Sequence, residues 1–316
     1  MVKFERILCP VDFSEFSAKA CEYAYSLAKQ YQATLFLQHA VQPPQVLYEY
    51  GAFPTPDISM YTASQEAETR LSEFARSHGR GGVAPKLIVQ EGVLPDAILA
   101  IADRNQVDLI VMGTHGRQGF NHLTLGSVTE KVLRRARCPV LAVRKPEHDF
   151  ITREGSADPV RLRKILYCTD FSDYARHALG YAFSLAMEYE AEITLLHVLD
   201  KGGSRKSLEE RTATASRRLE KLVPDDVRNW CSVTAAVRAG LPYHEIVRLA
   251  IEAQTDLITM GVRGRGSLDL ALFGSTTHRV LQVGPCPVLA VHEPAESVER
   301  TEQASVGFSK VSQALA

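Results

Sequence analysis

Short apolar runs alternate with longer amphipathic stretches along the first half of the chain. The run Ile7–Val11 carries no charged or hydroxyl side chain, and such a run is typical of a strand buried on both faces of a parallel sheet. Apolar residues then recur at helical spacing between Ala20 and Ala28, and Ser14 stands where a helix N-cap is expected. The pattern therefore predicts a strand, a turn and a helix at the start of the chain.

The same alternation continues to residue 143. We expect further strands at residues 34–40, 86–90, 109–112 and 140–143, and helices at residues 63–77, 96–103 and 128–135. Strands that alternate with helices predict an α/β fold with a parallel sheet and right-handed crossovers. Ligands of such sheets lie beyond the carboxyl ends of the strands. This chain places Asp12 after the first strand and Gly113 after the fourth.

The second half of the chain repeats the first. Ile7–Ala28 returns as Ile165–Ala186 at an offset of 158, and Cys138–Val143 returns as Cys286–Val291 at an offset of 148. The first copy is therefore ten residues longer in its middle, where the segment 42–62 is rich in Pro and Tyr. We expect a long loop there, which is either a lid over a site or a surface for a partner.

The repeat predicts two domains, at residues 1–145 and 164–293. The segment between them, residues 146–163, is polar and contains Pro and Gly, a composition typical of linkers. Residues 294–316 form a polar tail, for which we expect little order.

Composition narrows the classes of function. The 316 residues include 36 basic and 37 acidic side chains, which argues against a broad surface for nucleic acid. No apolar run reaches the length of a membrane span, and the N-terminus has no signal-peptide pattern. We therefore expect a cytoplasmic protein that contacts no membrane. The six cysteines form no C-x-x-C pair, so we expect buried free thiols and no metal site.

A glycine pattern follows the fourth predicted strand of each copy. In the first copy Gly113 and Gly116 are followed by nine residues and then by Gly126-Ser127, and the second copy keeps this spacing. Glycine lets the backbone approach an oxyanion closely. A helix that starts at the serine offers free N–H groups and the positive end of its dipole. The pattern therefore favours a phosphate-binding loop in each half.

Charged residues near each loop fit the same ligand. Arg117 and Arg265 follow the second glycine and can neutralise phosphate charge, and Asp12 and Asp170 can accept hydrogen bonds from ribose hydroxyls or an adenine amine. Simpler roles remain open, because the arginines could be solvated loop charges and the aspartates helix caps. Ser127 could likewise cap its helix, since an acidic residue three positions on completes a capping-box pattern.

The histidines of the repeat do not indicate catalysis. His115 in the first glycine loop corresponds to Arg263 in the second copy, so a catalytic histidine is not expected there. His39 and its counterpart His197 are expected to orient the end of the second strand. The Walker A pattern is absent, and so is a G-x-G-x-x-G motif after the first strand.

These motifs resemble the universal stress protein family over nearly the whole chain. The resemblance rests on Pro10-Val11-Asp12, on the glycine spacing, which is similar to the family's ATP-binding signature, and on the closing Cys138–Val143. It implies two tandem Rossmann-like domains of the adenine nucleotide alpha hydrolase type, each with a five-stranded parallel sheet of order 3-2-1-4-5. It also implies that residues 140–143 pair antiparallel with residues 288–291, which gives an intrachain pseudo-dimer that can dimerise again.

The resemblance further implies that the ligand is an adenine nucleotide, ATP with Mg²⁺ as an optional companion. Carried over position by position, the implied binding residues are Pro10, Val11, Asp12, Val41, Met112, Gly113, Gly116, Arg117, Gly126, Ser127, Val128, Thr169, Asp170, Leu199, Met260, Gly261, Gly264, Arg265, Gly274, Ser275 and Thr276. Cys168-Thr169 departs from Pro10-Val11, which makes the adenine wall of the second copy different. Both glycine sets are intact, so both sites are expected to bind.

Three functions compete on the sequence alone. The leading hypothesis is an ATP-binding regulator of the stress response with little or no turnover, because no acidic residue near the glycine loop recurs in both copies. The second hypothesis is an enzyme, a slow ATPase or an autophosphorylating protein. The third is an interaction scaffold that holds no nucleotide.

Overall fold

A computed structural model describes residues 2–42, 58–79, 82–115, 125–144, 149–152, 159–200, 202, 207–264 and 274–292. The elements of the first half are β1 (Arg6–Pro10), α1 (Glu15–Tyr31), β2 (Thr34–Val41), α2 (Ile58–His78), β3 (Lys86–Glu91), α3 (Asp96–Arg104), β4 (Leu109–Gly113), α4 (Ser127–Arg135) and β5 (Val140–Val143). Those of the second half are β6 (Lys164–Cys168), α5 (Asp173–Glu188), β7 (Glu192–Leu199), α6 (Leu208–Glu220), α7 (Asp225–Trp230), β8 (Val233–Ala239), α8 (Pro242–Glu252), β9 (Leu257–Gly261), α9 (Ser275–Val283) and β10 (Val288–Val291).

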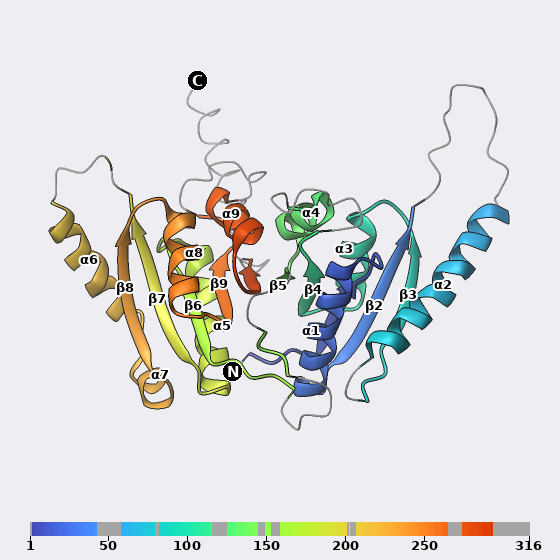
Figure 1. Ribbon diagram of the computed structural model, residues 1–316, viewed down its shortest axis with the longest axis horizontal. Helices are drawn as coiled ribbons and strands as arrows, with labels where there is room; N and C mark the ends of the chain where they lie inside the picture. The colour runs from blue at the N-terminus through green and yellow to red at the C-terminus, as the bar shows by residue number, and fades with distance from the viewer. Residues whose placement is uncertain are drawn as a thin grey trace, which may run out of the picture.

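One continuous sheet runs through both halves of the molecule (Figure 1). Its strand order is β3-β2-β1-β4-β5-β10-β9-β6-β7-β8. Each half thus has the predicted 3-2-1-4-5 order, and neighbouring strands within a half are parallel. The two fifth strands pair antiparallel as predicted, with Leu141 opposite Leu289.

The start of each half folds as the apolar pattern predicts. Strand β1 alternates its side chains between the two faces of the sheet, so that Ile7 and Cys9 lie in one core and Leu8 in the other. Ser14 caps α1 by accepting a hydrogen bond from the first helical turn, and Ser172 caps α5 in the same way. These caps set where each helix leaves the end of its strand.

Helix α2 begins earlier than its apolar pattern predicts. It starts at Ile58, so the last residues of the segment expected to be a long loop are helical. Residues 43–57 of that segment lie outside the described residues, as does the tail after residue 292. The expected lid or partner surface therefore stays a prediction.

Two apolar cores, one on each face of the sheet, extend through both halves. Tyr23 of α1 and Phe183 of α5 belong to the first core, and Ile98 of α3 and Ile246 of α8 belong to the second. Because buried apolar area is the main favourable contribution to folding, the shared cores stabilise the halves jointly.

The segment expected to be a polar linker is partly buried. In its described parts, four apolar side chains lie in the core on the face of α1 and α5: Phe150, Ile151, Val160 and Leu162. Asp149 accepts a hydrogen bond from the hydroxyl of Tyr23 at 2.7 Å. The composition of the segment did not predict this packing, because its few apolar residues stand among many polar ones.

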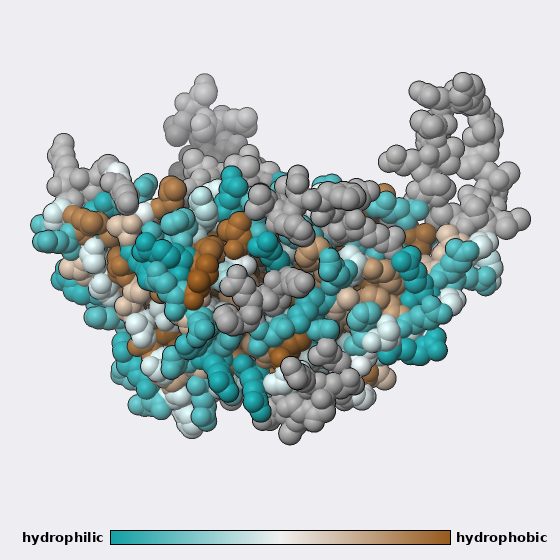
Figure 2. All heavy atoms as spheres, viewed as in Figure 1, coloured by the Kyte–Doolittle hydropathy of each residue, from teal (hydrophilic) through white to brown (hydrophobic). Residues whose placement is uncertain are grey.

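The molecular surface is of mixed polarity. Figure 2 shows apolar residues in small groups among hydrophilic ones on the face that it displays. Among the described helices, none is both long and apolar enough to cross a bilayer. Cys9, Cys21, Cys168 and Cys286 are buried as predicted, whereas Cys138 and Cys231 are only partly buried. Desolvation raises the pKa of the Cys138 thiol to about 12.

A histidine of the second half reaches a helix of the first. His292 follows β10, and its Nε2 donates a hydrogen bond to the carbonyl of Leu133 in α4 at 2.6 Å. Desolvation lowers the pKa of His292 to about 4, with the positive charge of Arg263 acting in the same direction. The ring is therefore neutral in the folded protein at neutral pH.

This contact predicts an acid-sensitive stability. Between pH 6.5 and about 4 the unfolded chain takes up a proton on His292 before the folded chain does, so the free energy of unfolding falls with pH, by up to about 3 kcal/mol. We expect His292→Gln to flatten this part of the profile, measured by urea unfolding between pH 7 and 4. The exposed His244→Gln is the control and should keep the wild-type slope; equal slopes in all three proteins would contradict the account.

Candidate functional site

A cleft of about 710 Å³ opens at the carboxyl ends of β1, β2 and β4, where α4 begins. The predicted residues that line it are Pro10, Val11, Asp12, Met112, Gly113, Gly126, Ser127 and Val128. They come from distant parts of the sequence and meet because parallel strands end at the same edge of the sheet.

Asp12 lies in the turn between β1 and α1. Its Oδ1 accepts hydrogen bonds from the backbone N–H and the hydroxyl of Ser14, at 3.0 and 2.6 Å. Asp170 repeats the backbone bond with Ser172 at 3.0 Å. The alternative role as a local cap is therefore real for one carboxylate oxygen. It is compatible with a ligand role, because a carboxylate has two oxygens and Asp12 lines the cleft.

His39 and His197 have the orienting role predicted for them. Each ring donates from Nδ1 to the carbonyl that precedes the aspartate, that of Val11 or Thr169, at 2.7 Å in both halves. These bonds tie the second strand to the turn after the first strand in each half.

Matched hydrogen bonds hold the ends of each glycine loop together. The hydroxyl of Thr129 donates to the carbonyl of Gly113 at 2.8 Å, and that of Thr277 donates to the carbonyl of Gly261 at 2.9 Å. These threonines were not predicted as site residues, although both copies carry one three residues after the last loop glycine. They keep the start of α4 or α9 beside the end of the fourth strand.

Glycine, and not serine, caps the helix that follows each loop. Gly126 and Gly274 are the N-caps of α4 and α9, and neither helix start has a side-chain cap. The alternative in which Ser127 forms a capping box is therefore wrong, because Ser127 is already the first helical residue. Ser127 and Val128 line the cleft, so the N–H groups of the first turn, which have no partner within their own helix, lie at the cleft.

Gly113 and Gly261, which are among the predicted binding residues, have a packing role. A Cβ at Gly113 would lie 2.9 Å from the backbone carbon of Phe16, and one at Gly261 would lie 2.8 Å from that of Tyr174. Helices α1 and α5 therefore contact the ends of β4 and β9 too closely for any side chain.

The second half arranges its predicted residues in the corresponding way. They follow β6, end β7 and β9, or cap and begin α9: Thr169, Asp170, Leu199, Met260, Gly261, Gly274, Ser275 and Thr276. A Cβ at Gly264 would lie 2.6 Å from Oδ2 of Asp170. Gly264, in the described part of this glycine loop, thus lies directly beside the aspartate.

Some predicted residues are not placed in the cleft. Three of them lie outside the described residues: Gly116, Arg117 and Arg265. Val41 ends β2 but is not among the residues that line the cleft, whereas Ala40 and Gln42 are.

The lining includes further buried polar residues that were not predicted, among them Gln38 and His115. Gln38 is 1% exposed and donates from Nε2 to the carbonyl of Ala97 at 3.1 Å, and its Oε1 has no hydrogen-bond partner within the described part of the chain. His115 is 5% exposed, with Nδ1 at 2.8 Å from Oγ1 of Thr114. A polar residue inside a predicted buried strand was the available signal for Gln38; the second half has Leu196 there.

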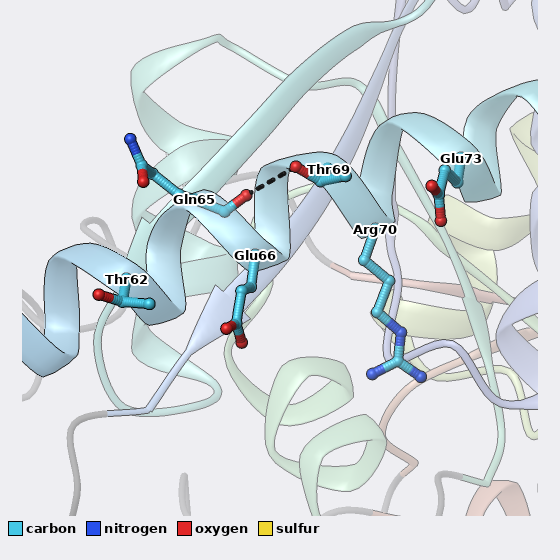
Figure 3. A pocket seen from close by; sticks show the side chains of 6 residues that line it. All are labelled: Thr62, Gln65, Glu66, Thr69, Arg70 and Glu73. Atoms are coloured by element: carbon cyan, nitrogen blue, oxygen red, sulfur yellow. Dashed lines mark hydrogen bonds between the residues drawn. The ribbon is translucent and has the colours of Figure 1, made fainter.

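A second hollow, of about 490 Å³, lies along α2. Its lining comes from this one helix: Thr62, Gln65, Glu66, Thr69, Arg70 and Glu73. Figure 3 shows Glu66 and Arg70 projecting to the same side of the helix. Ligand sites bring together groups from several elements, so the cleft at the strand ends is the better candidate.

The model of the universal stress protein family matches residues 3–144 and 161–292. The chain belongs to this family. The two matches confirm the predicted tandem, and the strand order agrees with the fold that the resemblance implied.

Known universal stress proteins resemble one half or both halves of the chain. One from Mycobacterium tuberculosis is 26% identical over 298 residues, which cover 91% of this chain and 96% of that protein. One from Methanocaldococcus jannaschii is 32% identical over 148 residues, which cover 46% of this chain and 85% of that protein. The crystal structure of a universal stress protein from Archaeoglobus fulgidus is 26% identical, covers 93% of this chain and 99% of its own, and has a TM-score of 0.69.

The close packing at Gly113 predicts a stability loss. Gly113→Ala should lower the free energy of unfolding by about 1–3 kcal/mol, because the new methyl group overlaps the backbone of α1. Gly180→Ala is the control, since a Cβ there meets nothing within 4 Å. It lies inside α5 and should stabilise by about 0.5–1 kcal/mol. Urea unfolding followed by circular dichroism measures both; wild-type stability of Gly113→Ala would contradict the packing account.

Proposed function

We propose that each half of the chain binds one adenine nucleotide, with ATP as the main ligand. The observation that carries the proposal is the cleft that has the Asp12 carboxylate and the start of α4 in one lining. A carboxylate accepts hydrogen bonds from hydroxyls, and a helix N-terminus attracts an anion. A nucleotide has both of these partners in one molecule, with the hydroxyls of its ribose at one end and the phosphate anion at the other.

The cleft has room and chemistry for each part of this ligand. Its volume of about 710 Å³ lies within the range of ~300–1,000 Å³ that small-molecule pockets span. Val11 and Met112 supply apolar surface for a flat base, and Asp12 faces the same cleft. Gly126 and Ser127 begin the helix whose N–H groups would hold phosphate oxygens.

We infer that the second half binds in the same manner. Asp170 and Gly264 are close neighbours, and Gly274 caps α9 as Gly126 caps α4. The apolar wall differs, since Thr169 and Leu196 replace Val11 and Gln38. The two sites should therefore differ in affinity for the base.

We further propose that the chain binds ATP with little turnover and acts as a cytoplasmic regulator of the stress response. Within the described part of the chain, the titratable side chains that line the first cleft are Asp12, His39 and His115. Oδ1 of Asp12 accepts two local hydrogen bonds, and Nδ1 of His39 donates to a backbone carbonyl. His115 has Arg263 as its counterpart. This set supports binding better than the activation of a water molecule.

Titration with ATP tests the proposal. Isothermal titration calorimetry should detect two sites per chain in the wild type. Gly264→Ala should abolish measurable binding at the second site, because its methyl group would push the Asp170 carboxylate out of its position. Asp12→Ala should weaken the first site by about 10- to 100-fold through the loss of hydrogen bonds to a charged group.

Gly202→Ala is the matched control for Gly264→Ala, since a Cβ there meets nothing within 4 Å; it should keep both sites. Phosphate release at about 1 per second or faster, the low end of ordinary enzymes, would contradict the low turnover. No binding of ATP, ADP or AMP by the folded wild type would refute the proposal itself.

A further inference from the structure

A strained residue follows the site aspartate in both halves. Phe13 and Phe171 both have φ of 62°, in the left-handed region that bulky side chains rarely adopt. Each stands between the aspartate and the serine that caps the next helix. Such a conformation persists only where its surroundings hold it in place, so the contacts of these two rings determine the shape of the turn.

Two contacts of the ring, with a histidine and with an arginine, recur in both halves. The ring centroid of Phe13 lies 4.5 Å from that of His39, and the corresponding distance between Phe171 and His197 is also 4.5 Å. On Phe13 lies the guanidinium of Arg70, with its Cζ 4.3 Å from the ring centroid. The second half has Arg218 at 3.8 Å from the centroid of Phe171.

The arginine occupies the same place in both halves, although the number of residues between it and the phenylalanine differs between the copies. Phe13 and Phe171 are related by the offset of 158, whereas Arg70 and Arg218 are related by the offset of 148. The ten-residue difference between the copies therefore lies between the phenylalanine and the arginine. Despite this difference, the arginine lies over the phenylalanine ring in both halves. A contact kept across a change of loop length points to a role in the shared site.

The histidine, the phenylalanine ring and the arginine together hold the backbone on both sides of the aspartate. Before Asp12, the carbonyl of Val11 accepts the hydrogen bond from His39. After it, the ring of Phe13 lies against His39 and Arg70. The backbone on either side of Asp12 is thereby fixed, and with it the direction of the carboxylate in the cleft.

We propose that Arg70 and Arg218 are positioning residues, which act through Phe13 and Phe171 to orient Asp12 and Asp170 toward the ribose hydroxyls of the bound nucleotide. The inference rests on the proposed function. Both arginines are exposed side chains of helices α2 and α6. Each can therefore be replaced without opening the core, and its effect on binding can be separated from an effect on folding.

The test compares ATP with 2′,3′-dideoxy-ATP, which lacks the ribose hydroxyls. In a Gly264→Ala background that leaves the first site, calorimetry should show ATP binding about tenfold or more tightly than the dideoxy analogue. Adding Arg70→Met should weaken ATP by about threefold to tenfold and leave the analogue unchanged, so the ratio of the two affinities falls. Adding Arg70→Met to Asp12→Ala should have no further effect, because the oriented group is already gone.

Arg76→Met is the control on the same helix, since its guanidinium bonds to the carbonyl of Ser72; it should keep the background ratio. The mirror experiment uses Arg218→Met in an Asp12→Ala background. An equal loss for both nucleotides would mean a merely structural role and overturn the inference, as would an unchanged ratio in Arg70→Met. A background that binds both nucleotides equally also overturns it, whereas a wild type that binds neither nucleotide refutes the proposed function as well.

Discussion

The antiparallel pairing of β5 with β10 is the interaction on which the rest of the molecule depends. It joins two parallel sheets into one, with Leu141 opposite Leu289, and covers two edges that would otherwise present unpaired backbone groups. The apolar cores then continue from one half into the other. The pairing orients the two halves relative to each other. It leaves open the carboxyl ends of the other strands, where the cleft lies.

Within a half, close packing at the end of the fourth strand shapes the site. Gly113 lets α1 approach β4 so closely that no side chain fits between them. The carbonyl of that same glycine accepts the hydroxyl of Thr129, which keeps the start of α4 beside the strand. The aspartate turn and the helix N-terminus thus meet across one cleft, and a ligand with a sugar at one end and an anion at the other suits both.

The turn that bears the aspartate carries strain. A left-handed phenylalanine costs of order 1–3 kcal/mol, and both halves accept this cost at the same place. The exposed cation–π contact contributes about 0.5–1 kcal/mol, so it offsets part of the strain together with the histidine. The cost of the strained backbone and the stabilisation by the cation–π contact are of similar size. A surface arginine can therefore influence the geometry of the cleft.

The residues alone predict the tandem repeat and bring Asp12 and the glycine loop to the same edge of a parallel sheet, because apolar periodicity and contiguous motifs are local properties of the chain. The 3-2-1-4-5 order and the pairing of residues 140–143 with 288–291 were predicted from the resemblance to a known family that these motifs carry. The folded structure was needed to show that Phe150 and Ile151 pack in the core, that Gly126 caps α4 in place of Ser127, and that Gln38 lines the cleft. Those outcomes depend on contacts between segments that are far apart in the chain, and no local sequence pattern specifies such contacts.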